Sequence, residues 1–269
     1  MSTERIVVGA ALTSDRLDEY MEWLTEHNRD LEISDFTRPG ALDSENLSDL
    51  VQFLKSRLQG YPGRLGIHAP YNMPEATSDL RIREVVVDRF KQSLDICAEI
   101  GATHMVLHSL RPFWDRLTRD QMRKEFDLFH ASIDSVVNAA KDADCILVIE
   151  NTRDKHPELL TELVKSFDSP YVRQSLDVGH AFVNHHYEGG PPPDYWVLEA
   201  ADVLEHVHLH DTDGYADRHW KIGQGRVDWY TLFEAIKSLA QRPRLIMELA
   251  SYDEIRQSAA WLSERDIAY

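Results

Sequence analysis

Residues 146–180 read ILVIENTRDKHPELLTELVKSFDSPYVRQSLDVGH, and this stretch decides the fold. It opens with a short apolar run at 146–150, continues through a longer segment of helical period, and closes with a second short run at 174–178. Short apolar runs joined by helical segments are typical of parallel strands connected by crossover helices. The stretch therefore predicts one strand–helix–strand unit of a parallel sheet.

The same alternation extends over the whole chain of 269 residues. We expect eight strands, at 6–11, 31–34, 65–68, 103–108, 146–150, 174–178, 206–210 and 245–248. Eight strand–helix units close into a (β/α)8 barrel, a fold whose usual length of about 250 residues fits this chain. The sequence therefore predicts an α/β protein with a single TIM-barrel domain that spans residues 1–269.

Capping and breaking residues indicate where the helices and loops of this barrel lie. Ser44 can cap one helix that Gly60 ends, while Thr118 and Gln121 can form a capping box at the start of another. The stretch GYADRHW at 214–220 fits neither regular period, so we expect a loop there.

Composition narrows the function classes. Lys and Arg number 29 against 46 Asp and Glu, which gives a formal net charge of −17 and disfavours non-specific binding to nucleic acid. Cys97 and Cys145 lie in apolar surroundings without the spacing of a thiolate metal site or a redox pair. The chain shows neither a signal-peptide pattern nor an apolar stretch of membrane-spanning length, so we expect a cytoplasmic protein that does not bind membranes.

Metal-ligand residue types stand where the predicted strands end, which is where barrel enzymes carry their active sites. These residues are His68, His108, Glu150, Asp177 with His180, His208 and Glu248. A carboxylate that follows a run such as ILVI is costly to desolvate unless a cation or hydrogen-bond donors meet it. One such residue can be a satisfied structural group, but agreement over six strands favours one or more divalent ions. Imidazole and carboxylate without thiolate suit Zn²⁺ or Mn²⁺ better than Ca²⁺.

Two further pairs of polar residues leave alternatives open. His208 and His210 point the same way on an extended strand, so their spacing does not say which one is the ligand. His210 can instead orient a ligand or contact substrate. Asp217 and His219 could clamp a further metal from the loop, or they could belong to a solvated polar loop.

In these motifs the chain resembles the xylose isomerase-like TIM-barrel superfamily, which includes sugar isomerases and epimerases as well as endonuclease IV. The resemblance runs from Ile6 to about Glu248. It rests on HAPY, GATHMVLH, ILVIENT, SLDVGHAF, VHLHD followed by DRHWKIGQG, and LIMEL, in this order along the chain.

The two branches of the superfamily imply different metal sites. In sugar isomerases and epimerases, the resemblance implies that Glu150, Asp177, His208 and Glu248 bind one ion while His180 contacts substrate. In endonuclease IV it implies three zinc ions, held by His68, His108, Glu150, Asp177, His180, His208, Asp217, His219 and Glu248. All these positions are filled. However, HSLRPFW and HLHDTDG replace the HPG turn and the HLNDSK motif of the endonucleases, which disfavours a role in DNA repair.

The sequence thus predicts a metal-dependent isomerase or epimerase of a small sugar or other hydroxy-carbonyl substrate. Glu150 and Glu248 would act as an acid/base pair through a metal-stabilised enediolate. The alternatives are a multi-zinc phosphodiesterase acting on abasic DNA and a non-catalytic sugar-binding barrel. Candidate substrate-binding residues are His180, His210, Trp114 and Lys221, with Phe113, Trp196, Trp220 and Tyr71 as further aromatic walls. The oligomeric state stays open.

Overall fold

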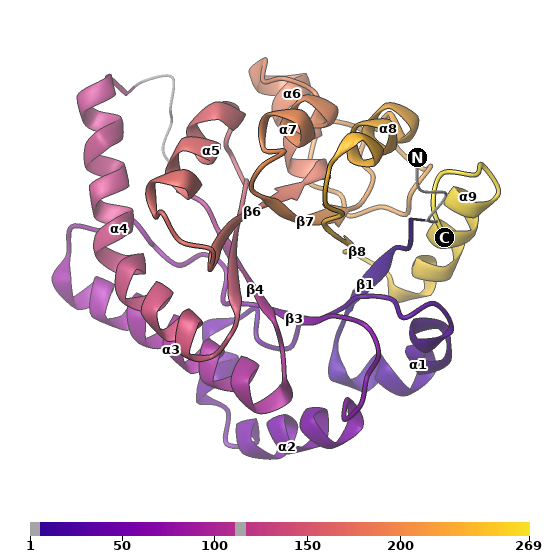
Figure 1. Ribbon diagram of the computed structural model, residues 1–269, viewed down its shortest axis with the longest axis horizontal. Coiled ribbons are helices and arrows are strands. Elements are labelled where there is room, and N and C mark those ends of the chain that lie inside the picture. Colours follow the sequence, from indigo (N-terminus) through magenta and orange to yellow (C-terminus); the bar gives the residue numbers. More distant parts are fainter. Residues whose placement is uncertain (1–5, 111–116) are drawn as a thin grey trace.

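The computed structural model describes residues 6–110 and 117–269, and in these residues eight parallel strands close into a barrel in the order of the chain (Figure 1). The strands are β1 (Gly9–Leu12), β2 (Leu31–Ile33), β3 (Leu65–His68), β4 (His104–His108), β5 (Ile146–Glu150), β6 (Val172–Asp177), β7 (Leu204–Leu209) and β8 (Arg244–Met247). The predicted (β/α)8 barrel is confirmed.

Helices form the outer ring that covers the strands (Figure 1). They are α1 (Leu17–Glu26), α2 (Leu47–Arg57), α3 (Leu80–Ile100), α4 (Arg119–Asp142), α5 (Pro157–Ser166), α6 (Val178–Glu188), α7 (Pro193–Glu199), α8 (Trp229–Ser238) and α9 (Ile255–Ser263). Each packs an apolar stripe against the barrel, as Phe90, Leu94 and Cys97 do on α3. In the part of the chain that the structure describes, no helix is both long and apolar enough to span a membrane.

The first strand lies later in the chain than the sequence predicts. The expected range was 6–11, but Ile6 and Val8 direct their backbone hydrogen bonds to Tyr269 at the other end of the chain. The barrel ladder begins at Gly9, where an added Cβ would meet the carbonyl oxygen of Asp30 at 2.0 Å. Glycine therefore allows β1 and the start of β2 to approach closely.

Helix starts follow local capping chemistry. The predicted capping box is present, since the Thr118 hydroxyl accepts from the backbone N–H of Gln121 and the Gln121 side chain accepts from that of Thr118. Ser44 is not the N-cap of α2, because the helix begins three residues beyond it, at Leu47, and Asn46 holds the N-cap position. Asp177 ends β6 and caps α6, so a single residue joins the strand to the helix.

Candidate metal centre at the carboxyl end of the barrel

A cavity of about 610 Å³ opens at the carboxyl ends of the strands. Side chains of several predicted site residues line it: His68, His108, Glu150, His180, Asp217, His219 and Glu248. Asp177 and His208 are fully buried beneath this lining, and we refer to their position as the floor of the cavity. The structure therefore brings together at one end of the barrel the residues that the sequence places at separate strand ends.

The first group of ligand atoms lies over strands β3 to β5. Nε2 of His68 is 3.9 Å from one oxygen of Glu150, and Nε2 of His108 is 4.0 Å from the other. Their potential ligand atoms lie within 4.8 Å of one another. Three such atoms around one point can hold a divalent ion.

The second group lies over the floor of the cavity. Nδ1 of His208 is 2.9 Å from Oε2 of Glu150, 3.5 Å from Oε2 of Glu248 and 3.9 Å from Oδ2 of Asp177. Carboxylates from β5, from the end of β6 and from the residue after β8 thus face a single imidazole nitrogen. This is the four-residue set that the sugar isomerase resemblance implies.

The third group lies at the mouth of the cavity. Nε2 of His180 is 3.2 Å from Oδ2 of Asp217, and Nε2 of His219 is 3.1 Å from Oδ1 of the same carboxylate. The loop brings Asp217 to His180 on α6, and although the Asp217 side chain stays 45% exposed, the clamp geometry is present. Because Nδ1 of His180 also lies 3.5 Å from Glu150, this group adjoins the other two.

Three imidazoles of the site each donate a hydrogen bond through one ring nitrogen. This bond fixes the direction in which the other nitrogen points. Nδ1 of His68 donates to the carbonyl of Ala69 at 2.7 Å, and Nδ1 of His219 donates to the carbonyl of Glu248 at 2.9 Å. Nε2 of His208 donates to Glu32 at 3.0 Å. The remaining nitrogens face the cavity carboxylates, as in metal sites whose histidines are held from behind.

Opposite charges outweigh burial throughout the site. Burial opposes ionisation of Asp177, yet His180 and His210 lower its pKa to about 2. Burial likewise disfavours protonated His180, but Asp177 and Asp217 raise its pKa well above the ordinary value. The pKa of His208 is also raised, by Glu248, Glu32 and Glu150. A cation that binds to these imidazole nitrogens must therefore compete with protons.

Two buried atoms of the site lack hydrogen-bond partners, and this bears on whether a divalent ion fits between them. Oε2 of Glu150 and Nδ1 of His208 lie 2.9 Å apart, yet neither makes an aligned hydrogen bond. Buried polar atoms are rarely left in this state. An ion between them would satisfy both, and a donor set of imidazole and carboxylate suits Zn²⁺ or Mn²⁺. The residues therefore fit a divalent metal.

The loop after β7 is held by a buried carboxylate. Asp211 accepts from the backbone N–H groups of Gly223 at 2.8 Å and Val227 at 3.2 Å, and from the indole of Trp229 at 3.0 Å. His219 has a left-handed backbone with φ of 49°, a conformation that costs a residue other than glycine about 1–3 kcal/mol. The anchored loop maintains this strain and aims the imidazole at Asp217.

Several predicted substrate contacts lie elsewhere. His210 is fully buried behind the cavity, where its Nε2 is 3.0 Å from Asp177 and its ring stacks on that of His219. Lys221 does not line the cavity, because its ammonium donates to Gln257 on α9. Trp196 is buried in the core from α7.

Of the remaining aromatic candidates, one lines the cavity and the others do not or lie outside the described residues. Tyr71 lines the cavity as expected. Trp220 makes a backbone bridge with Asp211 instead of lining the cavity. Phe113 and Trp114 lie outside the described residues.

Some contributors to the site were not predicted from the sequence. Asn151 holds the ends of β5 and β6 together, since its side chain accepts from the backbone N–H of Asp177 at 2.8 Å and donates to that residue's carbonyl at 3.1 Å. Asp211 fixes the loop, and Glu32 orients His208 from below. Their signal in the sequence is weak, because Asn151 and Asp211 simply follow stronger candidates in ENT and HLHD.

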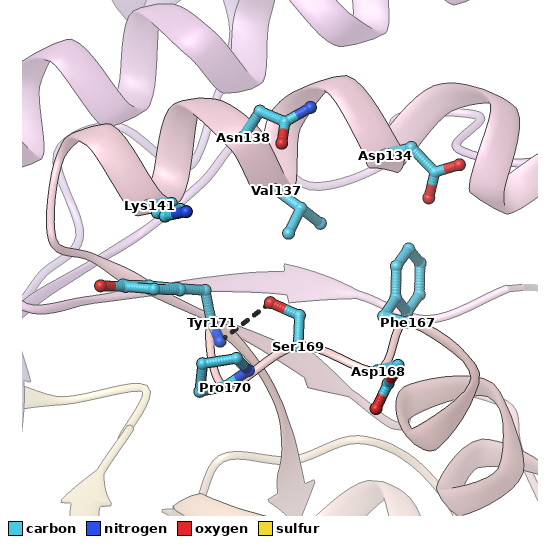
Figure 2. A pocket seen from close by; sticks show the side chains of 9 residues that line it. All are labelled: Asp134, Val137, Asn138, Lys141, Phe167, Asp168, Ser169, Pro170 and Tyr171. Atoms are coloured by element: carbon cyan, nitrogen blue, oxygen red, sulfur yellow. Dashed lines mark hydrogen bonds between the residues drawn. The ribbon is translucent and has the colours of Figure 1, made fainter.

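A second hollow, of about 470 Å³, lies between the end of α4 and the segment that leads into β6 (Figure 2). Phe167, Pro170 and Tyr171 line it together with Asp134 and Lys141. It faces the amino ends of the strands, opposite the cavity, and none of the groups of potential metal ligands found in the described residues lies there. Barrel enzymes place their chemistry at the other end, so the cavity is the candidate active site.

Comparisons with known proteins agree with this geometry. The uncharacterised protein MJ1311 of Methanocaldococcus jannaschii is 26% identical over 84% of this chain and 76% of its own length. The solved structure of the TTHB071 protein from Thermus thermophilus, soaked with ZnCl2, is 26% identical with a TM-score of 0.74 over 96% of each chain. A D-tagatose 3-epimerase-like protein is 24% identical, with a TM-score of 0.76 over 96% of each chain, and shows the same fold. Residues 19–265 match the xylose isomerase-like TIM barrel family, and the chain belongs to this family.

Proposed function

We propose that the protein is a metal-dependent isomerase or epimerase of a small sugar or another hydroxy-carbonyl compound. The observation that carries this proposal is the approach of Glu150 and Glu248 to one nitrogen of His208 from two different strands, beside an open cavity. Two carboxylates around one point can remove and return a proton on the same substrate. The family and the fold shared with a D-tagatose 3-epimerase-like protein support this proposal.

Four residues would hold the ion of this enzyme: Glu150, Asp177, His208 and Glu248. When bound, a divalent ion would polarise the substrate carbonyl and stabilise the negative charge that develops on its oxygen. His210 would keep Asp177 in place from behind the cavity, and Glu32 would do the same for His208. Both therefore act as positioning residues.

The protein's own groups would carry the proton. Glu150 is buried and its pKa is held well below the ordinary value, against the effect of burial, by His208 and His180, so it is an ionised carboxylate. One of the two glutamates would take the proton from the carbon beside the carbonyl, and the other would return it. His180 would bind a substrate hydroxyl at the mouth of the cavity.

The test uses solvent deuterium. The protein, loaded with Mn²⁺ or Zn²⁺, is mixed in D2O with aldoses, ketoses and their phosphates, and NMR follows both the product and the deuterium on carbon. We expect deuterium on the carbon next to the carbonyl. Glu150→Gln and Glu248→Gln should each slow turnover by about 10²-fold or more, because each removes one proton carrier. Glu264→Gln, which changes an exposed glutamate paired with Arg265, is the control.

Full activity in both single variants would overturn the two-glutamate mechanism. Binding of a sugar with neither turnover nor deuterium exchange would instead support a non-catalytic sugar-binding barrel.

A second candidate function rests on the two flanking groups of ligand atoms. His68 and His108 on one side, and Asp217 with His219 on the other, are more ligands than one ion needs. They would suit a multi-zinc phosphodiesterase that acts on abasic DNA, in which several cations neutralise a phosphate. The net charge of −17 counts against a polyanionic substrate.

Metal stoichiometry separates the two candidates. Elemental analysis of the protein purified without chelators is compared with that of the His68→Ala and Asp217→Ala variants. One cavity ion that survives both changes would favour the isomerase or epimerase. Two or three cavity zinc ions, partly lost in each variant, together with cleavage of an abasic oligonucleotide, would favour the phosphodiesterase.

A further inference from the structure

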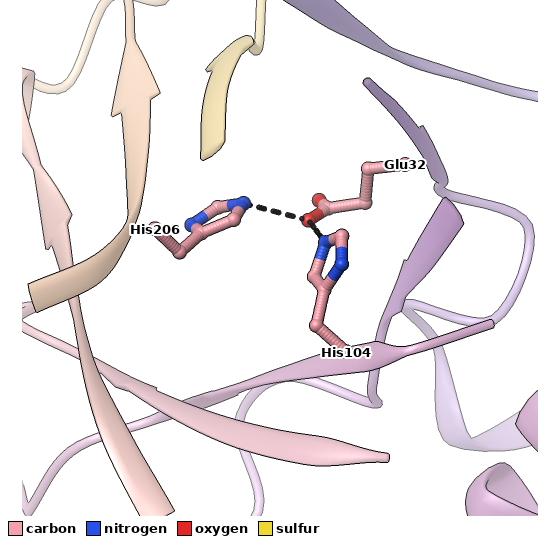
Figure 3. A group of neighbouring side chains, drawn as sticks. All are labelled: Glu32, His104 and His206. Carbon is pink, nitrogen blue, oxygen red and sulfur yellow. Dashed lines mark ion pairs between the residues drawn. The ribbon is translucent and has the colours of Figure 1, made fainter. Parts of the chain in front are cut away.

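A separate cluster of metal-ligand side chains lies inside the barrel, below the cavity. It consists of Glu32 on β2, His104 on β4 and His206 on β7, and the three side chains point toward one another across the barrel interior (Figure 3). All three are fully buried. Barrel interiors are usually filled by branched apolar residues, so an anion and two imidazoles here require a compensating partner.

The facing atoms of the cluster are close but not satisfied. Oε2 of Glu32 is 3.1 Å from Nε2 of His206 and 3.5 Å from Nε2 of His104. None of these three atoms makes an aligned hydrogen bond. In a tetrahedral site with metal–ligand distances near 2.1 Å, donor atoms stand about 3.4 Å apart. The observed separations match a metal site better than a set of hydrogen bonds.

Neighbouring groups orient the ligand atoms from outside the cluster. The hydroxyl of Ser175 lies 2.8 Å from Nδ1 of His206, which leaves Nε2 of that ring directed at Glu32. The other oxygen of Glu32 accepts from His208, so Oε2 is the oxygen left for a cation. A Cβ on Gly66 would meet the ring of His104 at 2.0 Å, and only glycine leaves room for that imidazole.

The donor set of the cluster suits a cation. His104 and His206 each direct Nε2 at Oε2 of Glu32. Two imidazoles and one carboxylate are a donor set for borderline transition metals, of which zinc is the commonest in closed sites.

We propose that Glu32, His104 and His206 form a buried binding site for one zinc ion, distinct from the cavity above it. A water molecule would complete four-coordination. Because the ligands come from three strands far apart in the sequence, the ion ties the barrel together from within. Through Glu32 it also fixes His208 on the cavity floor. This site does not depend on the reaction that the cavity catalyses.

The first arm of the test leaves the core unchanged. The wild-type protein and an Asp217→Asn/Glu248→Gln variant, which loses ligands only in the solvent-accessible cavity, are produced in medium with added ZnCl2, treated with a chelator and desalted. Elemental analysis should find about one zinc per chain retained in both proteins, because the core site has no open path to the chelator. Loss of all zinc from the double variant would overturn the proposal.

The second arm changes the core. His104→Gln should lose the retained zinc, whereas His130→Gln, in a histidine on α4 that contacts Asp134 and Ser166, should keep it. Ser175→Ala removes only the hydroxyl behind His206 and should weaken retention by about 10- to 100-fold. Full retention of zinc in folded His104→Gln would mean that the zinc is bound outside this cluster. The three side chains would then form a hydrogen-bonded cluster without metal, and the proposal would be overturned. If His104→Gln does not fold, the Ser175→Ala result and the first arm decide.

The zinc ion retained in the core must not be included in the number of ions assigned to the cavity. To distinguish the two candidate functions, only the cavity ions are counted. These are the ions that the chelator removes from the wild-type protein and that the Asp217→Asn/Glu248→Gln variant lacks. A missing core zinc would therefore leave the isomerase proposal intact. Likewise, an inactive cavity would leave the core zinc in place.

Discussion

His219 holds a proton that a metal ion would have to displace. Burial disfavours the charged ring, but the carboxylates of Asp217 and Glu248 raise its pKa to about 9, above the ordinary 6.5. A raised pKa of this kind stabilises the fold fully below about pH 6.5, and the contribution is lost as pH rises through about 9.

For the metal-free protein we therefore expect the melting temperature to fall between pH 7 and pH 9.5. His219→Asn should flatten this part of the profile, because asparagine tolerates the left-handed backbone but carries no proton. Thermal melts monitored by circular dichroism check both curves. An unchanged slope in His219→Asn would contradict the assignment of this titration to His219.

At the same scale, the different roles of His208 and His210 could not be predicted from the sequence. The sequence predicts both residues on one extended strand, 206–210, but does not predict which is the ligand; in the structure β7 ends at Leu209 and His210 follows it. The structure separates them by depth and by neighbours. His208 faces Glu150 and Glu248, while His210 lies behind Asp177, where the absence of a Cβ on Gly179 makes room for its ring.

At the scale of elements, the loop from β7 to α8 depends on Asp211. In the wild-type protein, three N–H donors face the carboxylate oxygens of Asp211. Asp211→Asn replaces one of these oxygens with an NH2 group, which cannot accept a hydrogen bond. We expect a loss of about 2–3 kcal/mol in the free energy of unfolding, because buried hydrogen bonds to a charged group are lost. In the multi-zinc arrangement of the second candidate function, zinc affinity at His180, Asp217 and His219 should fall as well, since the loop carries two of these ligands.

Urea denaturation measures the stability change, and hydrogen exchange of the loop measures its opening. Asp213→Asn is the matched control in the same loop, because Asp213 forms an ion pair with the partly exposed Arg218 and loss of such a pair should leave the free energy of unfolding nearly unchanged. Equal stability loss in the two variants would contradict the anchoring role of Asp211.

Strand ends were more predictable than strand starts. The carboxyl ends of β3, β4 and β5 match the expected ranges, because an apolar run that closes on His or Glu is a clear signal. The start of β1 was misplaced, since the pairing of Ile6 and Val8 with Tyr269 joins the two ends of the chain. A contact over that distance leaves no trace in a local pattern.

At the scale of the whole molecule, the candidate ligands connect most of the barrel. Stripping the ions should lower the melting temperature by roughly 5–11 °C, because a ligand at about 100 times its Kd contributes about 2.7 kcal/mol to a chain of this size. Scanning calorimetry with and without added ZnCl2 checks this. The Asp177→Asn variant should show a smaller shift, and an equal shift would place the stabilising ion elsewhere.

The barrel and its ring of ligands followed from the sequence, whereas the core cluster did not. Glu32, His104 and His206 lie within strands and not at their carboxyl ends, where active-site residues of a barrel are expected. A strand written LEI or EHVHL gives no sign of which neighbours its polar residues meet. Only closure of the sheet brings β2, β4 and β7 together across the interior.

Because Asp177 caps α6, the amino end of that helix points at the cavity. Aligned peptide dipoles give this end a partial positive charge of about half an elementary unit. That charge lies beside Asp177 and His180 and offsets part of the repulsion among the converging carboxylates. The cavity ligands can therefore converge before an ion occupies the cavity, and metal uptake at the cavity becomes a step that follows folding instead of a condition for it.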